Sequence, residues 1–136
     1  MRHSMDALVG KTVTALRVLN DESCLVVETT SGPLVFCVAG DCCSESWFAD
    51  ITGALNLIGG TVQTVEQAAL PDYNCDDGRG RQEVDEVYGY RIATTKGHCV
   101  IAFRNSSNGY YGGWLSEVTE APDGVWREIT SDDWHA

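Results

Sequence analysis

The sequence predicts an α+β domain, a mainly antiparallel sheet of about six strands with one short helix packed across it. Two observations lead to this fold class. Short stretches rich in Val, Thr and Leu alternate with turn residues, which is typical of antiparallel strands. One stretch in the first half changes to a helical spacing of apolar residues. The chain has 136 residues, the size of a single domain, and it contains no internal repeat.

The opening part of the domain is expected to be a three-stranded meander. Its strands are separated by Asn-Asp-Glu-Ser and Ser-Gly-Pro turns. Along the third strand, Leu34, Phe36 and Val38 alternate with Val35 and Cys37, as a half-buried face requires. The expected strands are residues 11–19, 24–30 and 33–38.

The segment "DCCSESWFADITGALNLIGG" predicts the helix. Ser44 or Ser46 can cap its N-terminus, and Gly59-Gly60 can end it. Gly53 within the helix would cost about 1 kcal/mol relative to alanine, so packing has to hold the helix in place. The apolar positions at helical spacing are Trp47, Ile51, Leu55 and Ile58.

The second half predicts further strands. "TVQTVEQAAL" reads as a strand and leads into the polar loop "PDYNCDDGRGRQ". "EVYGYRIATTKGHCVIAFRN" predicts a hairpin with a turn at Lys96-Gly97. That turn would align Ile92 with Ile101 and Tyr90 with Phe103 across the hairpin. "WLSEV" and "VWREIT" predict two more strands, the second at an edge.

We therefore expect a leader or expression remnant at residues 1–8, a single α+β domain at residues 9–118 and a C-terminal extension at residues 119–136. The extension is expected to hold an edge strand and an acidic tail.

Composition narrows the classes of function. A formal charge of −11 repels phosphate backbones, so general nucleic-acid binding is not expected, although a DNA mimic would also be acidic. No stretch has the length of a membrane span, and the N-terminus lacks the apolar region of a signal peptide. We therefore expect a cytoplasmic protein whose six cysteines are reduced.

The stretch "IAFRNSSNGYYGGWLSEV" is the first candidate binding segment. Its glycines allow close approach of the backbone, and Tyr110 and Tyr111 offer flat faces with polar tips. Arg104 and Asn105 could hold a carboxylate, phosphate or carbonyl of a partner. A hairpin connection whose tyrosines pack on the core is the alternative, and both interpretations stay open.

The stretch "GDCCSESW" is the second candidate. Cys43 and Ser44 would lie at a helix N-terminus, which lowers the pKa of a thiol and attracts anions. A nucleophilic cysteine also needs a base, and no motif places His98 or His3 beside Cys43. Buried, inert cysteines are the favoured interpretation.

Metal sites have weak support. The adjacent Cys42-Cys43 pair does not have zinc-ligand spacing, so no zinc site is expected. A calcium site has an EF-hand-like spacing of oxygen ligands, but its sixth position is Asp77 instead of glycine, which favours a plain solvated loop. The calcium candidates are Asp72, Asn74, Asp76 and Glu83. We expect no cofactor, and we find no phosphate-binding, nucleophile-elbow or zinc-protease motif.

Both candidate segments, with "LIGGTV" and "YGYRIATTKG", resemble an uncharacterised domain family found in bacteriophages, notably those of actinobacteria, and in bacterial genomes. The resemblance covers roughly Val9 to Val118. The family has no assigned activity, so the resemblance implies a source and a fold without a mechanism. The positions that match its pattern are Asp41, Cys42, Cys43, Ser44, Trp47, Arg104, Asn105, Ser107, Asn108, Tyr110 and Tyr111.

The expected function is that of a non-enzymatic, phage-type accessory protein that binds a host protein, for host takeover or against a defence system. The alternative is a small-ligand binder, such as a nucleotide-signal sponge or a metal-binding module, and a cysteine hydrolase or transferase comes third. The oligomeric state stays open. The expected contact residues are Arg104, Asn105, Ser107, Asn108, Tyr110, Tyr111 and Trp114, with Cys43 and Ser44 added in the alternative.

Overall fold

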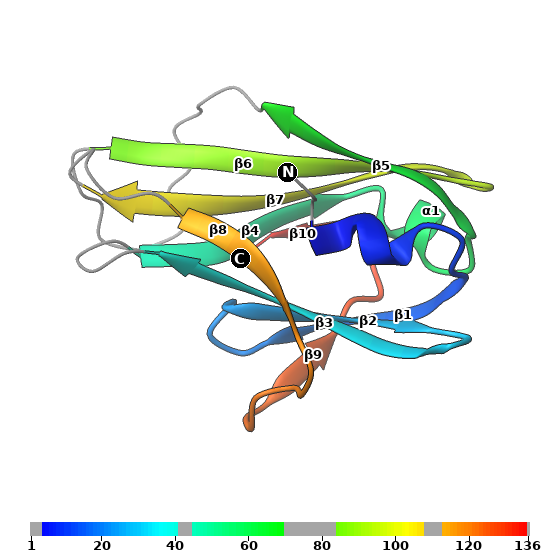
Figure 1. The fold of residues 1–136 in the computed structure, drawn as a ribbon, viewed down its shortest axis with the longest axis horizontal. Helices are drawn as coiled ribbons and strands as arrows, with labels where there is room; N and C mark the ends of the chain where they lie inside the picture. Colours follow the sequence, from blue (N-terminus) through cyan, green and yellow to red (C-terminus); the bar gives the residue numbers. More distant parts are fainter. Residues whose placement is uncertain (1–3, 41–44, 70–83, 108–112, 136) are drawn as a thin grey trace.

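The computed structural model describes residues 4–40, 45–69, 84–107 and 113–135 of the chain (Figure 1). These residues form a β-sandwich of two five-stranded antiparallel sheets. We call the sheet with the order β8-β3-β2-β1-β9 sheet 1 and the sheet with the order β10-β4-β7-β6-β5 sheet 2. Sheet 1 consists of β1 (Val13–Leu19), β2 (Cys24–Thr29), β3 (Gly32–Gly40), β8 (Gly113–Val118) and β9 (Trp126–Glu128). Sheet 2 consists of β4 (Glu45–Thr52), β5 (Val62–Ala69), β6 (Val84–Thr94), β7 (Gly97–Ser107) and β10 (Asp133–His135).

The predicted fold class, one sheet of about six strands with a helix across it, is wrong. The segment expected to be helical contains the strand β4, and the helix α1 (Ala54–Leu57) is a single turn. Residues 47–51 are all buried, so β4 is covered on both faces. Such a strand lacks the alternation of apolar and polar residues that identifies a half-buried strand. The helical spacing of Trp47, Ile51, Leu55 and Ile58 was therefore misleading.

The expected strands of the meander are confirmed as β1, β2 and β3, and the strands expected at "TVQTVEQAAL", "WLSEV" and "VWREIT" are confirmed as β5, β8 and β9. The hairpin of β6 and β7 is also present, but its register differs. Ile92 pairs with Cys99 instead of Ile101, and Thr94 pairs with Gly97, so the turn is formed by Thr95 and Lys96. A shift of two residues keeps every side chain on its expected face, which is why the apolar pattern could not distinguish the two registers.

The core lies between the two sheets. Sheet 1 contributes Leu25 and Phe36, and sheet 2 contributes Phe48 and Ile101, each with no exposed surface. Aromatic rings extend this layer, since Phe103 contacts Phe48 edge-on and stacks on Tyr90.

Both ends of the described chain take part in this packing. Met5 and Leu8 belong to the 3-10 helix η1 (Ser4–Leu8), which lay in the expected leader, and both are fully buried in the core. Near the other end, β9 forms an edge of sheet 1 and β10 forms an edge of sheet 2 (Figure 1). Between them, Ile129 is buried in the core. Residues 126–135 therefore connect the two sheets. No helix within the described ranges is long and apolar enough to cross a membrane.

Candidate functional site

The two candidate binding segments leave the sandwich at the same end. Residues 41–44 are bounded by Gly40 and Glu45, and residues 108–112 are bounded by Ser107 and Gly113. Gly40 pairs with Gly113 in sheet 1, and Glu45 pairs with Ser106 in sheet 2. Each sequence motif therefore passes from one sheet to the other between strand ends that are paired with those of the other motif.

A third connection, between β5 and β6, also ends at this end of the sandwich. The strand β6 begins at Val84, which pairs with Ser107 at the end of β7. In Figure 1 these strand ends lie together on the left side of the sandwich. We call the end defined by Gly40, Glu45, Val84, Ser107 and Gly113 the loop end.

The structure places four of the predicted site residues in strands at the loop end. Arg104, Asn105 and Ser107 belong to the last part of β7, and Trp114 belongs to the first part of β8. Asn105 pairs with Ser46 on one side and with Glu86 on the other. The remaining predicted residues lie outside the described residues: Cys43, Ser44, Asn108, Tyr110 and Tyr111 of the binding segments, and Asp72, Asn74, Asp76 and Glu83 of the calcium candidate.

Arg104 is buried, with only 1% of its surface exposed. Its direct partner across the strands is Trp47 of β4, which is also 1% exposed. Phe103, the preceding residue, belongs to the core between the sheets, so the alternation along β7 directs Arg104 to the opposite face of sheet 2. The Arg104 side chain therefore lies beneath the surface of the loop end and is not exposed for contact with a partner.

The pairing of Trp47 with Arg104 was not expected from the sequence. The two residues belong to separate sequence motifs, and the helix predicted between Ser44 or Ser46 and Gly59-Gly60 hid their relation. The two motifs meet because β4 and β7 are neighbours in sheet 2, a pairing between distant segments that local sequence does not specify.

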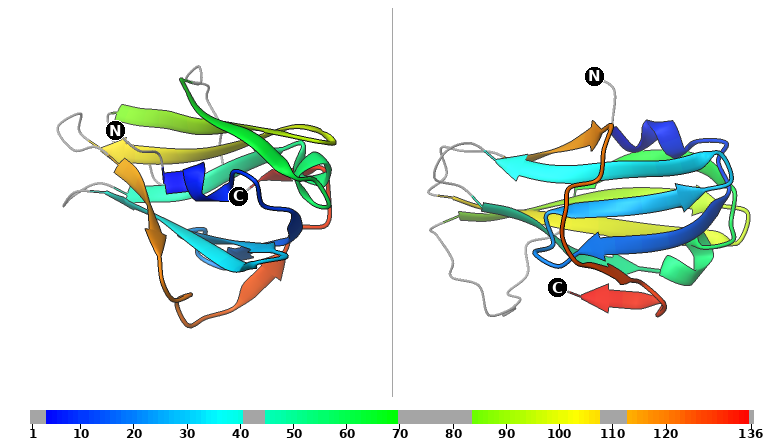
Figure 2. Two further views of the ribbon diagram at one scale, coloured as in Figure 1. Left: turned by 45° about the vertical axis from the view of Figure 1, so that its right-hand side comes forward. Right: turned by 90° about the horizontal axis from the view of Figure 1, so that it is seen from below.

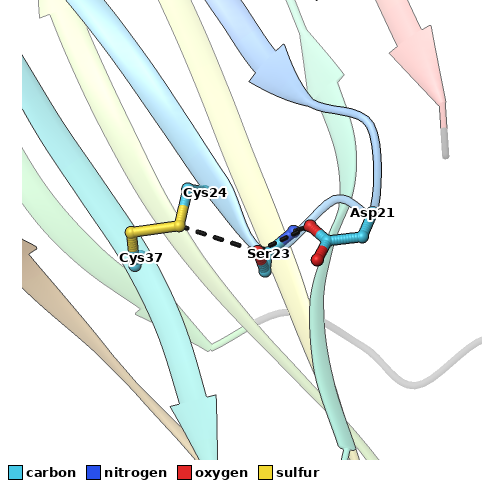
Figure 3. Close-up of a disulfide and its surroundings, with 4 residues drawn as sticks. All are labelled: Asp21, Ser23, Cys24 and Cys37. Atoms are coloured by element: carbon cyan, nitrogen blue, oxygen red, sulfur yellow. Dashed lines mark hydrogen bonds between the residues drawn. A yellow bond between two sulfur atoms is a disulfide. The ribbon is translucent and has the colours of Figure 1, made fainter. Parts of the chain in front are cut away.

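The cysteines behave differently from the expectation that all are reduced. Cys24 of β2 and Cys37 of β3 are direct cross-strand partners, and a disulfide joins them with a Cα–Cα distance of 4.1 Å (Figure 3). The hydroxyl of Ser23 donates to a carboxylate oxygen of Asp21 at 2.6 Å, beside this bond. The cysteines of the second candidate segment lie outside the described residues.

Cys99 is a free thiol, but it has no exposed surface. Burial raises the pKa of the Cys99 thiol to about 12, and the carboxylate of Asp132 adds to this effect. A thiolate is the reactive form, so Cys99 does not qualify as a nucleophile near neutral pH. His98, the neighbouring histidine, is exposed, and its backbone carbonyl accepts a hydrogen bond from Asn56 at 3.0 Å.

One histidine and one carboxylate do meet. A ring nitrogen of His135 in β10 lies 2.5 Å from a carboxylate oxygen of Asp50 in β4, and the two residues are direct strand partners. This contact adds a side-chain link to the backbone pairing of β10 with β4. No group of three or more metal-ligand side chains occurs within the described ranges.

Comparison with known proteins gives a family and a viral relative. The family described as "Domain of unknown function (DUF7448)" matches residues 6–116. The "Uncharacterized protein L278" of Acanthamoeba polyphaga mimivirus is 38% identical over 81 residues, which are 55% of this chain and 60% of that protein. The chain thus spans about 60% of the length of this relative. No solved structure matches. The expected link to bacteriophages of actinobacteria stays a prediction.

Proposed function

This chain belongs to the DUF7448 family, and we propose that it is a non-enzymatic binding module that recognises another protein through the loop end of its sandwich. The observation that carries this proposal is the pairing of Gly40 with Gly113 and of Glu45 with Ser106. It brings together the ends of two segments that are more than sixty residues apart in the sequence, as the positions 41–44 and 108–112 show. Rigid sandwiches that present several connections at one end are a common scaffold for recognition.

The composition of these segments supports binding. The second segment contains Tyr110 and Tyr111, and tyrosine is enriched among the residues that dominate the energy of protein interfaces. Asn105, Ser107 and Asn108 add amide and hydroxyl groups that can pair with the backbone of a partner.

The buried residues of the loop end have a supporting part in this proposal. Arg104 and Trp47 lie under the surface, where they fix the strand ends from which the segments start. The contacts themselves come from the residues between the strand ends. The formal charge of −11 adds a long-range attraction to a basic surface, so the proposed partner is a host protein with a positively charged patch.

A site-specific crosslinking experiment tests the proposal. A photoreactive benzoylphenylalanine replaces Tyr111 in one protein and Ser31 in a control protein, because Ser31 lies in the turn between β2 and β3 at the opposite end of the sandwich. Each protein is irradiated in extract of the host cells, and the adducts are identified by mass spectrometry. We expect one dominant adduct from position 111 that is absent from position 31.

Competition makes the result specific. Excess wild-type protein should abolish the adduct at position 111, whereas a variant with Tyr110→Ala and Tyr111→Ala should not, although its urea unfolding curve remains that of the wild type. Equal adducts from both positions, or equal competition by the double variant, would show that the loop end is not the binding surface.

The same convergence of strand ends also supports the small-ligand alternative. Cys43 and Ser44 of the first segment and Asn105 of the second are then brought to one end, where a nucleotide or a metal ion could contact both. A ligand at 100 times its dissociation constant stabilises the folded state by about 2.7 kcal/mol. Melting temperatures measured with a panel of nucleotides and divalent cations test this alternative, and an unchanged value throughout the panel counts against it.

A further inference from the structure

A second candidate site lies on the outer face of sheet 1, away from the loop end. The strands β8 and β9 are the two opposite edges of this sheet, so the connection between them has to cross it. Figure 2, in its right-hand view, shows residues 119–125 running across β3, β2 and β1 on the outer side of the sandwich. We call residues 119–125 the strap.

The strap covers a hollow with a volume of about 360 Å³. Val26 and Val35, which are paired across β2 and β3, form its floor, and Trp126 and Ala121 line it from the side of the strap. Protein interiors seldom leave a void larger than a water molecule, whereas small-ligand sites begin at roughly 300 Å³. The hollow therefore has the size of a binding site.

The floor of the hollow does not belong to the central core. Leu25, Val27 and Phe36 point into the core, so the intervening Val26 and the neighbouring Val35 face outward. They are nevertheless only 8% and 5% exposed. A second small core beneath the strap would explain two outward valines, but a well-packed core would not leave the hollow open.

The strap is held at both of its ends. At its start, Val118 at the end of β8 pairs with Val35. At its end, the backbone N–H of Asn20 donates to the carbonyl of Val125 at 2.8 Å. The hollow is thus a fixed part of the sandwich surface.

The charges around the hollow have one predominant sign. Arg17 lines it and is engaged by two carboxylates, Glu28 by an ion pair and Glu128 by a contact of 3.3 Å. Glu28, which accepts a hydrogen bond from Arg17, raises the pKa of the guanidinium, so Arg17 remains charged and occupied. The strap adds Glu120 and Asp123 and contains no basic residue. A bound anion would meet an occupied arginine and an excess of carboxylates.

We propose that this hollow binds a small organic cation with an apolar or aromatic body. The body lies on Val26 and Val35, and the cationic group lies near Glu28. The indole of Trp126 can add a cation–π contact or stack on an aromatic body.

A series of three probes with one ring system tests the ligand class. Tryptamine is a cation, tryptophol is neutral and indole-3-acetate is an anion. Each is titrated into ¹⁵N-labelled protein, and the amide signals of β2, β3 and the strap are followed by NMR. We expect saturable shifts at these amides with tryptamine at a dissociation constant of about 1 mM or tighter, and about tenfold weaker binding of indole-3-acetate.

Two variants and a control complete the test. Glu28→Gln should weaken tryptamine binding about threefold or more and leave tryptophol unchanged, whereas Glu117→Gln, an exposed carboxylate of the same sheet outside the hollow, should change neither. Val35→Phe should fill the hollow and abolish the binding of all three probes, and Ala121→Phe fills it from the strap if the first variant does not fold. The absence of saturable shifts at these amides, equal binding of the anion, or unchanged binding when the hollow is filled would each overturn the proposal.

Discussion

Trp47 on β4 lies directly opposite Arg104 on β7, and each of these large side chains is 1% exposed. They come from the two candidate binding segments. These segments therefore share a pair of buried side chains as well as paired strand ends. A charged side chain is costly to bury unless polar groups around it compensate for the loss of water. The stability of the loop end is therefore expected to depend on the interactions of the Arg104 side chain.

Replacing Arg104 by alanine should reduce the free energy of unfolding by about 3 kcal/mol, because it removes a long buried side chain together with its interactions. Arg91→Ala is the matched control, since Arg91 is exposed on β6 of the same sheet and should change stability by less than about 0.5 kcal/mol. Urea unfolding of both variants gives the comparison. Similar values for the two arginines would show that Arg104 does not support the loop end.

The disulfide gives a second prediction. It joins Cys24 to Cys37 over a sequence separation of 13, and a bridge of this span contributes about 2–3 kcal/mol. A reducing agent should lower the urea midpoint of the wild type to that of the variant with Cys24→Ser and Cys37→Ser, and it should not affect the variant. Wild-type protein with an unchanged midpoint in reductant, and with both thiols then open to alkylation, would mean that the bond adds no stability.

Cys99 predicts a dependence on pH. Its pKa in the folded protein is raised from 9.0 to about 12, so the folded state holds the proton more tightly than the unfolded state does. The resulting stability is fully present below pH about 9 and falls by up to about 1.4 kcal/mol per pH unit above it. The stability difference between wild type and Cys99→Ala, measured by denaturant unfolding from pH 8 to 11, should therefore shrink above pH 9. A constant difference would contradict the shift.

Gly53 reverses an expectation drawn from the helix. If Gly53 were helical, its replacement by alanine would stabilise the protein by about 1 kcal/mol. In the structure its φ is +80°, and an added Cβ would lie 2.4 Å from the carbonyl oxygen of His98. Gly53→Ala should therefore destabilise the protein by about 3 kcal/mol or more, whereas Gly10→Ala, at φ +85° in open space, should lose about 1 kcal/mol. Thermal unfolding distinguishes the two variants. A Gly53→Ala variant more stable than the wild type would support the helical assignment instead.

Ile129 tests whether the C-terminal segment belongs to the fold. It lies outside residues 6–116, which match the family, but its side chain is only 4% exposed and contacts the core. Ile129→Ala should cost about 2–4 kcal/mol through the cavity that it leaves. Val125→Ala, at a side chain that is 68% exposed, should have an effect of less than about 0.5 kcal/mol. Equal urea midpoints for the two variants would make residues 119–135 an appendage.

The sequence predicted those strands that are recognisable by local pattern. The strands β1, β2 and β3 are rich in Val, Thr and Leu and are bounded by turn residues, so their positions could be read from the chain. Three features of the fold could not be read from the chain. The strand β4 is buried on both faces and has no alternation, the register of β6 and β7 is ambiguous to a shift of two residues, and the division into two sheets depends on pairings between distant segments.

The candidate site divides in the same way. The two motifs were visible because unusual residues gather in each of them. Their proximity depends on the pairing of Gly40 with Gly113 and of Glu45 with Ser106, which local sequence does not specify. The burial of Arg104 was also hidden, because a charged residue at the end of a strand is usually exposed. The bond between Cys24 and Cys37 was not expected, because all six cysteines were predicted to be reduced.

The edge strands β9 and β10 also constrain the order in which the protein folds during its synthesis. Arg17 on β1 pairs with Glu128 on β9, and 111 residues separate them. At a translation rate of about 5–20 residues per second, the outer edge of β1 waits on the order of 5 to 20 s for its partner. Throughout that interval the unpaired N–H and C=O groups of β1 can join the strand of another chain. The outer edge of β1 thus gains its protection against association only late in synthesis, when β9 has emerged.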